Sequence, residues 1–190
     1  MAYESQYPPA YSDTYVKATT EYYTGVGHPY FATDPSKSLI GAWSNLAWVS
    51  SDGSITNQRF HIDLGIAKAI TRIYYENYHS AGTYANDGAK AYTLWGSNIP
   101  GDFADLVYAN NGSWTQIGGA LQFALHPSSD IVDPHYEIVT NTTAYRYYAI
   151  KIANTWGGTD YMGLRRIELQ LQPPQTIDVS IVIAPQISGT

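Results

Sequence analysis

Residues 59–64 read Arg59-Phe60-His61-Ile62-Asp63-Leu64, with apolar and polar side chains in strict alternation. Successive side chains of a β-strand point to opposite faces, so this period of two places the apolar three on one face and the polar three on the other. The same alternation returns in residues 166–171, Arg-Ile-Glu-Leu-Gln-Leu. The pattern predicts two packed antiparallel sheets with the following residues inside: Phe60, Ile62, Leu64, Ile150, Ile152, Ile167 and Leu169.

Five further segments are rich in Tyr, Ile, Val, Thr and Trp, which favour strands. They are residues 69–76, 89–97, 113–117, 136–139 and 145–153. Gly, Asn, Ser, Thr and Pro separate them, and nowhere does an apolar spacing of three and four persist for about three helical turns. Several short strands between turn clusters indicate an all-β sandwich or barrel.

The composition of the chain indicates which kinds of molecule it can bind. The chain has 190 residues, which suits one domain, and no cysteine, so neither a disulfide nor a thiolate is available. Ten Lys and Arg against 16 Asp and Glu give a net charge of -6, and the cations are scattered, so we expect no nucleic-acid partner. The 18 Tyr and 5 Trp, against 4 Phe, favour a half-wet binding surface for sugars or proteins.

Two segments flank a predicted domain of residues 24–171. Residues 1–23 are rich in Tyr, Ser and Pro and predict an extended arm or a strand added late. After Leu171, Pro173 and Pro174 end the sheet, because proline cannot donate to its ladder. Within the arm of residues 172–190, residues 176–183 alternate like a strand. We expect an arm to contact a second copy or a larger assembly, with a strand laid along the same domain as the alternative.

Neither export nor membrane insertion is expected. Residues 1–9 show neither the basic nor the apolar region of a signal peptide. No apolar run approaches the roughly 18 to 20 residues that span a bilayer.

Ordered motifs then suggest a family. Trp48-Val49-Ser50, followed by Asp63-Leu64-Gly65 at the end of a strand, resembles the Trp-x-Ser and Asp-Leu-Gly steps of the discoidin family, also called the coagulation factor V/VIII type C domain. Residues 91–98, 113–117, 144–152 and 163–169 match its later strands in the correct order. The resemblance implies a galactose-binding-like jelly-roll β-sandwich of about eight antiparallel strands. Between Ser38 and Trp48 an insertion that includes Trp43 departs from the family pattern. The family's disulfide is absent.

The resemblance also implies a ligand site in loops at one end of the sandwich. Carbohydrate-binding modules of this family stack a sugar on Trp or Tyr and bind its hydroxyls with Asn, His, Arg or Asp. Loops 25–31, 77–88 and 154–161 are expected to reach that end. The candidate ligand-binding residues are Tyr78, His79, Tyr84, Asn154, Trp156 and Tyr161. In the alternative, Trp156 and some of the tyrosines cap the core.

A structural calcium is a further implication of the resemblance, with Asp34 and Glu168 as its carboxylate ligands. Calcium takes six to eight oxygen ligands. Asp34 precedes Pro35 and is equally well placed as a turn residue, and Glu168 as an outward strand residue.

Catalysis is the contrasting class. The carboxylates Glu76, Asp87, Asp133 and Asp160 could supply the pair of a glycosidase, but nothing in the sequence fixes their separation. No nucleophile elbow, phosphate loop or His-Glu-x-x-His motif is present. We therefore predict a non-catalytic module that binds a carbohydrate or other cell-surface ligand.

Discoidin-type domains normally act outside cells, whereas no export signal is seen. We therefore expect a phage virion component, made in host cytoplasm, exposed on the virion surface and contacting other virion proteins, with a role in receptor binding or decoration. The alternatives are a structural virion protein without glycan binding, a protein released by another route, or a glycoside-active enzyme.

Overall fold

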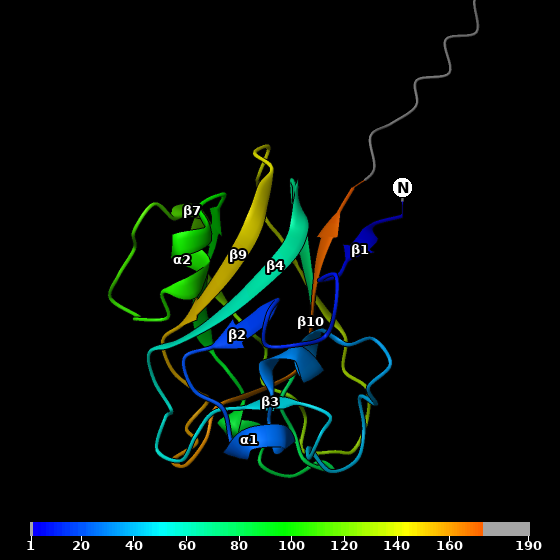
Figure 1. The fold of residues 1–190 in the computed structure, drawn as a ribbon. Helices are drawn as coiled ribbons and strands as arrows, with labels where there is room; N and C mark the ends of the chain where they lie inside the picture. Colours follow the sequence, from blue (N-terminus) through cyan, green and yellow to red (C-terminus); the bar gives the residue numbers. More distant parts are fainter. Residues whose placement is uncertain (1, 173–190) are drawn as a thin grey trace, which may run out of the picture.

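The computed structural model describes residues 2–172 and is a sandwich of two five-stranded antiparallel sheets (Figure 1). In the first sheet the strand order is β1-β10-β5-β8, and β3 also pairs with β10. The bounds of these strands are β1 Glu4–Gln6, β3 Trp48–Val49, β5 Arg72–Asn77, β8 His135–Ile138 and β10 Gly163–Leu171. In the second sheet the strand order is β2-β4-β9-β6-β7. The bounds of these strands are β2 Val16–Ala18, β4 Gln58–Lys68, β6 Ala91–Ser97, β7 Thr115–Gln122 and β9 Tyr145–Ile152. Four single turns of helix complete it: α1 Tyr23–Val26, η1 Pro29–Thr33, η2 Ala85–Asp87, α2 Pro100–Ala104. None of the described helices is long and apolar enough to cross a membrane.

The core confirms the expected all-β sandwich and the residues expected inside it. All seven residues predicted from the period of two are buried, none more than 5% exposed: Phe60, Ile62, Leu64, Ile150, Ile152, Ile167 and Leu169. Trp48 lies fully buried among them and donates from Nε1 to the Thr20 carbonyl at 3.0 Å.

The outward face of β4 is also covered. The segment around α2 packs across it (Figure 1), so Arg59 and His61 are fully buried rather than facing solvent. The His61 ring lies 5.0 Å from Trp114, and burial lowers the pKa of this imidazole to about 4. His61 is therefore a packed neutral ring, out of reach of a substrate.

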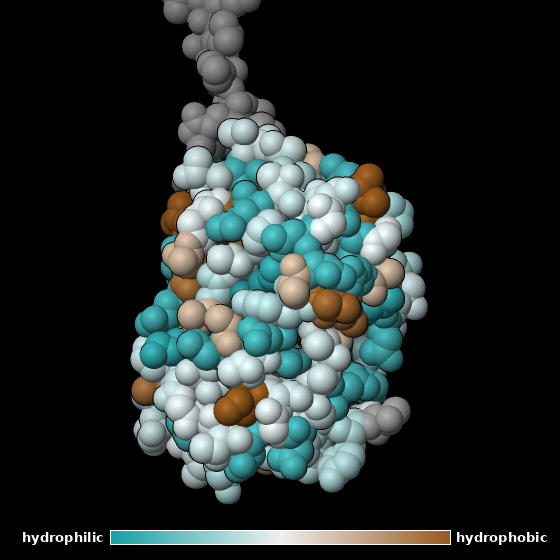
Figure 2. Space-filling view, turned by 90° about the vertical axis from the view of Figure 1, so that its left-hand side faces the viewer, coloured by the Kyte–Doolittle hydropathy of each residue, from teal (hydrophilic) through white to brown (hydrophobic). Residues whose placement is uncertain are grey.

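Figure 2 shows one face of the molecule, on which brown apolar residues are scattered among polar ones. Single exposed apolar side chains are normal on a soluble domain and indicate no docking patch on this face.

The N-terminal segment, expected as an arm or a late strand, contributes one strand to each sheet. Strand β1 pairs with β10, and β2 pairs with β4. Each has three residues, too few to show a period in the sequence. The strand expected at residues 176–183 lies outside the described residues.

The insertion that carries Trp43 is anchored by Arg165 of β10. This guanidinium is fully buried and donates from Nε to the Leu39 carbonyl at 3.2 Å, from Nη2 to Gly41 at 2.6 Å and from Nη1 to Ala42 at 3.4 Å. One cation on a rigid strand thus fixes the backbone that leads into Trp43.

Candidate functional site

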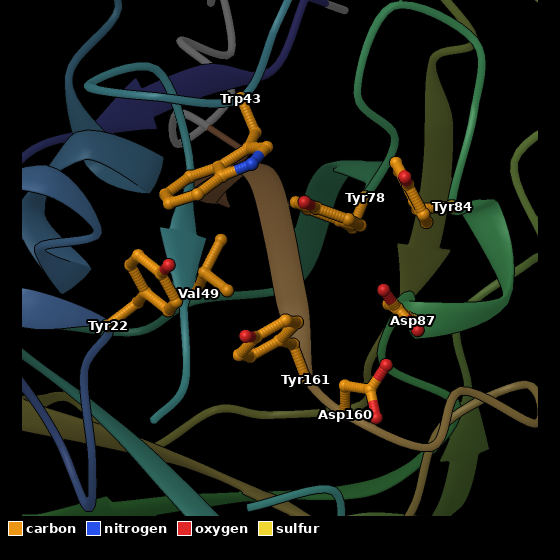
Figure 3. A pocket seen from close by; sticks show the side chains of 8 residues that line it. All are labelled: Tyr22, Trp43, Val49, Tyr78, Tyr84, Asp87, Asp160 and Tyr161. Carbon is orange, nitrogen blue, oxygen red and sulfur yellow. The ribbon is translucent and has the colours of Figure 1, made fainter. Parts of the chain in front are cut away.

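A cavity of about 300 Å³ opens among the loops at one end of the sandwich (Figure 3). Its lining comes from the segment after β2, the insertion, β3, the loop after β5 and the segment before β10. The lining residues are Tyr22, Trp43, Val49, Tyr78, Tyr84, Asp87, Asp160 and Tyr161.

Tyr22 organises the aromatic side of the cavity. Its ring meets Trp43 edge to face at 5.0 Å between ring centroids, and Tyr161 in the same way at 5.2 Å. Its backbone N–H donates to the Val49 carbonyl at 2.7 Å, which fixes it to β3. Edge-to-face contacts are favourable and orient the rings around a common space.

Tyr78 and Tyr84 belong to the loop after β5. Tyr78 is 3% exposed, and its ring lies against Gly163, where a Cβ atom would overlap it. Tyr84 is 65% exposed and has a left-handed backbone with φ +57°. Such a conformation is unfavourable for a tyrosine, and strain of this kind is concentrated at binding loops.

Two carboxylates face each other on the wall opposite Tyr22 (Figure 3). Asp87 is 7% exposed, and burial raises the pKa of its carboxyl to about 6, with a further contribution from the charge of Asp160. Their loops are joined because the Gly158 N–H donates to the Asn86 carbonyl at 2.9 Å. Among the described residues no Lys, Arg or His forms an ion pair with either carboxylate.

Three of the six predicted ligand-binding residues line this cavity: Tyr78, Tyr84 and Tyr161. The structure places His79, Asn154 and Trp156 outside its lining. His79 is fully buried and donates from Nε2 to the Leu39 carbonyl at 2.9 Å.

The other two serve the neighbouring strands. Asn154 Oδ1 accepts from the Ala91 N–H at 3.1 Å, and Trp156 Nε1 donates to the Phe123 carbonyl at 3.1 Å. All three side chains therefore satisfy backbone groups of neighbouring segments.

Sequence reasoning assigned no ligand contact to Tyr22, Trp43 or Val49. Asp87 and Asp160 stand in the loops expected at the ligand end, but neither was among the six candidate ligand-binding residues. Trp43 stands in the insertion, where the family resemblance offers no counterpart. An added aromatic residue next to the expected ligand loops was the one available signal.

The residues expected to bind calcium are engaged by other groups. Asp34 Oδ1 accepts from the Ser36 N–H at 2.9 Å and from its hydroxyl at 2.7 Å, which is the geometry of a turn. Glu168 accepts from Arg166 Nη1 at 3.3 Å, and Nη2 of the same guanidinium donates to the Lys37 carbonyl at 2.7 Å. The Arg166 guanidinium thus links the early loop to Glu168, and calcium binding by Asp34 and Glu168 stays a prediction from the sequence.

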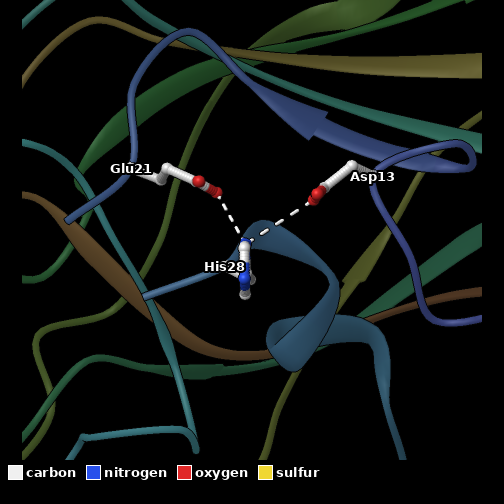
Figure 4. Close-up of side chains that lie close together, drawn as sticks. All are labelled: Asp13, Glu21 and His28. Atoms are coloured by element: carbon white, nitrogen blue, oxygen red, sulfur yellow. Dashed lines mark hydrogen bonds and ion pairs between the residues drawn. The ribbon is translucent and has the colours of Figure 1, made fainter. Parts of the chain in front are cut away.

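Among the described residues, one group of three His and acidic side chains has its possible metal-ligating atoms within 4.8 Å of one another (Figure 4). It consists of Asp13, Glu21 and His28. His28 Nδ1 lies 2.9 Å from Glu21 Oε2 and 3.6 Å from Asp13 Oδ1. The buried imidazole thereby joins the segments on either side of β2 to η1.

The fold is a jelly-roll β-sandwich of the galactose-binding-like type, and a cavity lies among the loops at one of its ends. Residues 37–170 match the family model DUF5000, a domain of unknown function, and the chain belongs to this family. No curated protein sequence matches the chain.

Solved structures of the same fold include several carbohydrate-binding modules. CpGH89CBM32-5 from Clostridium perfringens, in complex with GalNAc-β-1,3-galactose, is 14% identical, with 81% of this chain and 92% of that chain covered and a TM-score of 0.56. The family 32 module of C. perfringens NanJ, in complex with galactose, is 16% identical, with 82% and 92% covered and a TM-score of 0.54. Chitosan-binding module 1 from a chitosanase/glucanase of Paenibacillus sp. IK-5 is 19% identical, with 81% and 92% covered and a TM-score of 0.51. At these identities the likeness shows the fold.

Proposed function

We propose that the chain is a non-catalytic carbohydrate-binding module and that the cavity at the loop end is its ligand site. The observation that carries this proposal is the gathering of five aromatic side chains and two carboxylates around one space. Flat rings pack on the C–H faces of a sugar, and carboxylates accept hydrogen bonds from its hydroxyls. The volume of about 300 Å³ lies at the lower end of the range for small-molecule pockets.

Neighbours of the same fold support a glycan as the ligand. The two C. perfringens modules described above were solved with galactose or GalNAc-β-1,3-galactose, and the CBM32 of AlyQ was solved with 4,5-unsaturated mannuronic acid. These ligands differ in charge, so the identity of the sugar must come from this chain's own cavity.

Binding is favoured over glycoside cleavage by the placement of the carboxylates. Glu76 is fully buried and accepts from Tyr74 and from the Asp133 N–H, so it lies outside the cavity lining. Asp87 and Asp160 stand on one wall (Figure 3), whereas the two carboxylates of a glycosidase flank the scissile bond. Release of reducing sugar from a bound oligosaccharide would instead identify an enzyme.

Trp43→Ala is expected to weaken binding of a glycan-array hit by about ten- to thirtyfold, because a stacked ring contributes on the order of 1 to 2 kcal/mol. The melting temperature should change little, since Trp43 is only partly buried. Calorimetric titration and thermal melts of the same samples measure both quantities.

The matched control is Trp156→Ala, which removes a ring that donates to the Phe123 carbonyl outside the cavity lining. This variant should lose stability and keep its affinity while folded. An unchanged affinity in Trp43→Ala, with loss in Trp156→Ala, would move the site to the loop that carries Trp156.

Assembly through the terminal segments stays a prediction from the sequence. We expect full-length protein to be oligomeric, and a version ending at Gln172 to be smaller, when both are measured by light scattering. Two identical, fully soluble monomers would remove the reason for expecting an interchain contact. The virion setting is tested separately: we expect tail, baseplate or capsid genes beside the gene for this chain, and their absence would favour a free lectin.

A further inference from the structure

The walls of the cavity are negatively charged and aromatic. Asp87 and Asp160 contribute the only charged side chains of the lining, and no Lys, Arg or His is among the eight lining residues. Burial raises the pKa of the Tyr78 phenol, so that ring stays neutral at neutral pH. The local charge is therefore that of the two carboxylates.

Cations near the cavity are committed elsewhere. Arg165, behind Tyr78, is fully buried and donates to three carbonyls of the insertion. Arg166 is paired with Glu168, and Lys90 lies over the Trp156 ring with Nζ 4.5 Å from its centroid. In the described part of the chain, these contacts leave the two cavity carboxylates without a positive partner.

We propose that the cavity selects glycans with a free, positively charged amino group, such as unacetylated glucosamine units, and that Asp87 and Asp160 bind this ammonium beside the aromatic rings. The inference rests on the proposed glycan-binding function and names the chemical class of the sugar.

The physical basis is the match between ammonium and cavity. An ammonium has three N–H donors and no acceptor, and charge-assisted bonds to carboxylates are about twice as strong as neutral ones. A cation within about 6 Å of a Trp or Tyr ring gains further attraction from the ring face, and more when it is desolvated. An N-acetyl group carries no charge, and a uronate would meet two carboxylates of its own sign.

The state of Asp87 supports this selection. Burial and the neighbouring Asp160 raise the pKa of its carboxyl, so an ionised Asp87 is costly until a cation pairs with it. The other titratable groups of the cavity lining are Asp160, on the same wall, and the tyrosines Tyr22, Tyr78, Tyr84 and Tyr161. None of these supplies a positive charge, so the ligand must do so.

The test compares three trisaccharides of equal length: glucosamine, N-acetylglucosamine and galacturonate trimers, titrated calorimetrically into the full chain near neutral pH. We expect the glucosamine trimer to bind at least tenfold tighter than the N-acetylated one, and the galacturonate trimer to bind weakest. Asp87→Asn and Asp160→Asn should each lower affinity for the glucosamine trimer by about tenfold. The same variants should alter binding of the N-acetylated trimer less than twofold.

Glu137→Gln is the matched control, because it removes the same charge from β8, outside the cavity lining. It should leave the preference for glucosamine unchanged. A fall in the Glu137→Gln variant equal to that in Asp87→Asn would show a long-range charge effect and overturn the assigned contact.

Failure of this inference is distinguishable from failure of the proposed function. Equal or tighter binding of the N-acetylated trimer overturns the cationic selection. If another glycan then binds and Trp43→Ala abolishes that binding, the carbohydrate-binding function stands. If no glycan binds the wild-type chain, both proposals fall.

Discussion

Arg165→Met is expected to lower the free energy of unfolding by about 3 kcal/mol, and to weaken glycan binding as much as Trp43→Ala does. Methionine retains much of the length of the side chain but none of its donors, so the carbonyls of Leu39, Gly41 and Ala42 lose their shared partner. Each net hydrogen bond to a charged donor contributes about 1.5 to 3 kcal/mol, partly offset because the buried charge is also removed. The backbone leading into Trp43 then loses its anchor.

Arg146→Met provides the comparison. Arg146 is 42% exposed at its side chain and pairs with Asp63 through two bonds of 2.8 and 2.9 Å. Water can replace much of a partly exposed ion pair, so we expect a much smaller loss of stability than in Arg165→Met and no effect on binding. Urea unfolding of the three proteins measures the stabilities. Equal losses in the two variants would contradict the anchoring role of Arg165.

The strands and core were predictable because they depend on local alternation. A one-residue slip would turn Phe60, Ile62 and Leu64 away from the core, so the pattern carries both the strand and its buried face. It does not say what covers the opposite face. The burial of Arg59 and His61 depends on the segment around α2, which is distant in the sequence, so the alternation could not predict it.

The cavity was predictable only in part, for a similar reason. Tyr78, Tyr84 and Tyr161 stand in long loops at the expected end, and the resemblance was enough to place them. Whether Trp156 contacts a ligand or a backbone carbonyl depends on which segment packs against it. The residues next to Trp156 in the sequence do not determine that packing. The contribution of Trp43 depends on Arg165, more than 100 positions later in the chain.

Asp87→Asn is expected to make the unliganded protein more stable at neutral pH, by about 1 to 3 kcal/mol. The Asp87 carboxyl has a pKa raised from 3.8 to about 6, so the folded state holds its proton more tightly than the unfolded chain does. Each tenfold difference in proton affinity corresponds to about 1.4 kcal/mol. The stability contributed by the protonated carboxyl is fully present below about pH 4 and is lost as the pH rises to about 6.

Asparagine carries no charge at any of these pH values, so the variant should lack this loss. Denaturant unfolding between pH 4 and 7.5 is therefore expected to give two curves that coincide at the acidic end, separate as the pH rises to about 6, and stay apart above it, with the variant higher. Glu137→Gln, which removes a charge away from the cavity, should differ from wild type by no more than about 0.5 kcal/mol. Parallel curves for wild type and Asp87→Asn would mean that Asp87 is not held in an unfavourable ionised state.

Adding the glucosamine trimer should narrow or cancel the stability advantage of the variant. A ligand stabilises the folded state according to its concentration relative to its Kd, and wild type is expected to bind about tenfold tighter than the variant. At saturating ligand that tenfold difference corresponds to about 1.4 kcal/mol in favour of wild type, which offsets much or all of the advantage of asparagine. A carboxylate that weakens the empty protein and strengthens the complex is one whose position is explained by the ligand, because the fold alone would be better served by an uncharged side chain.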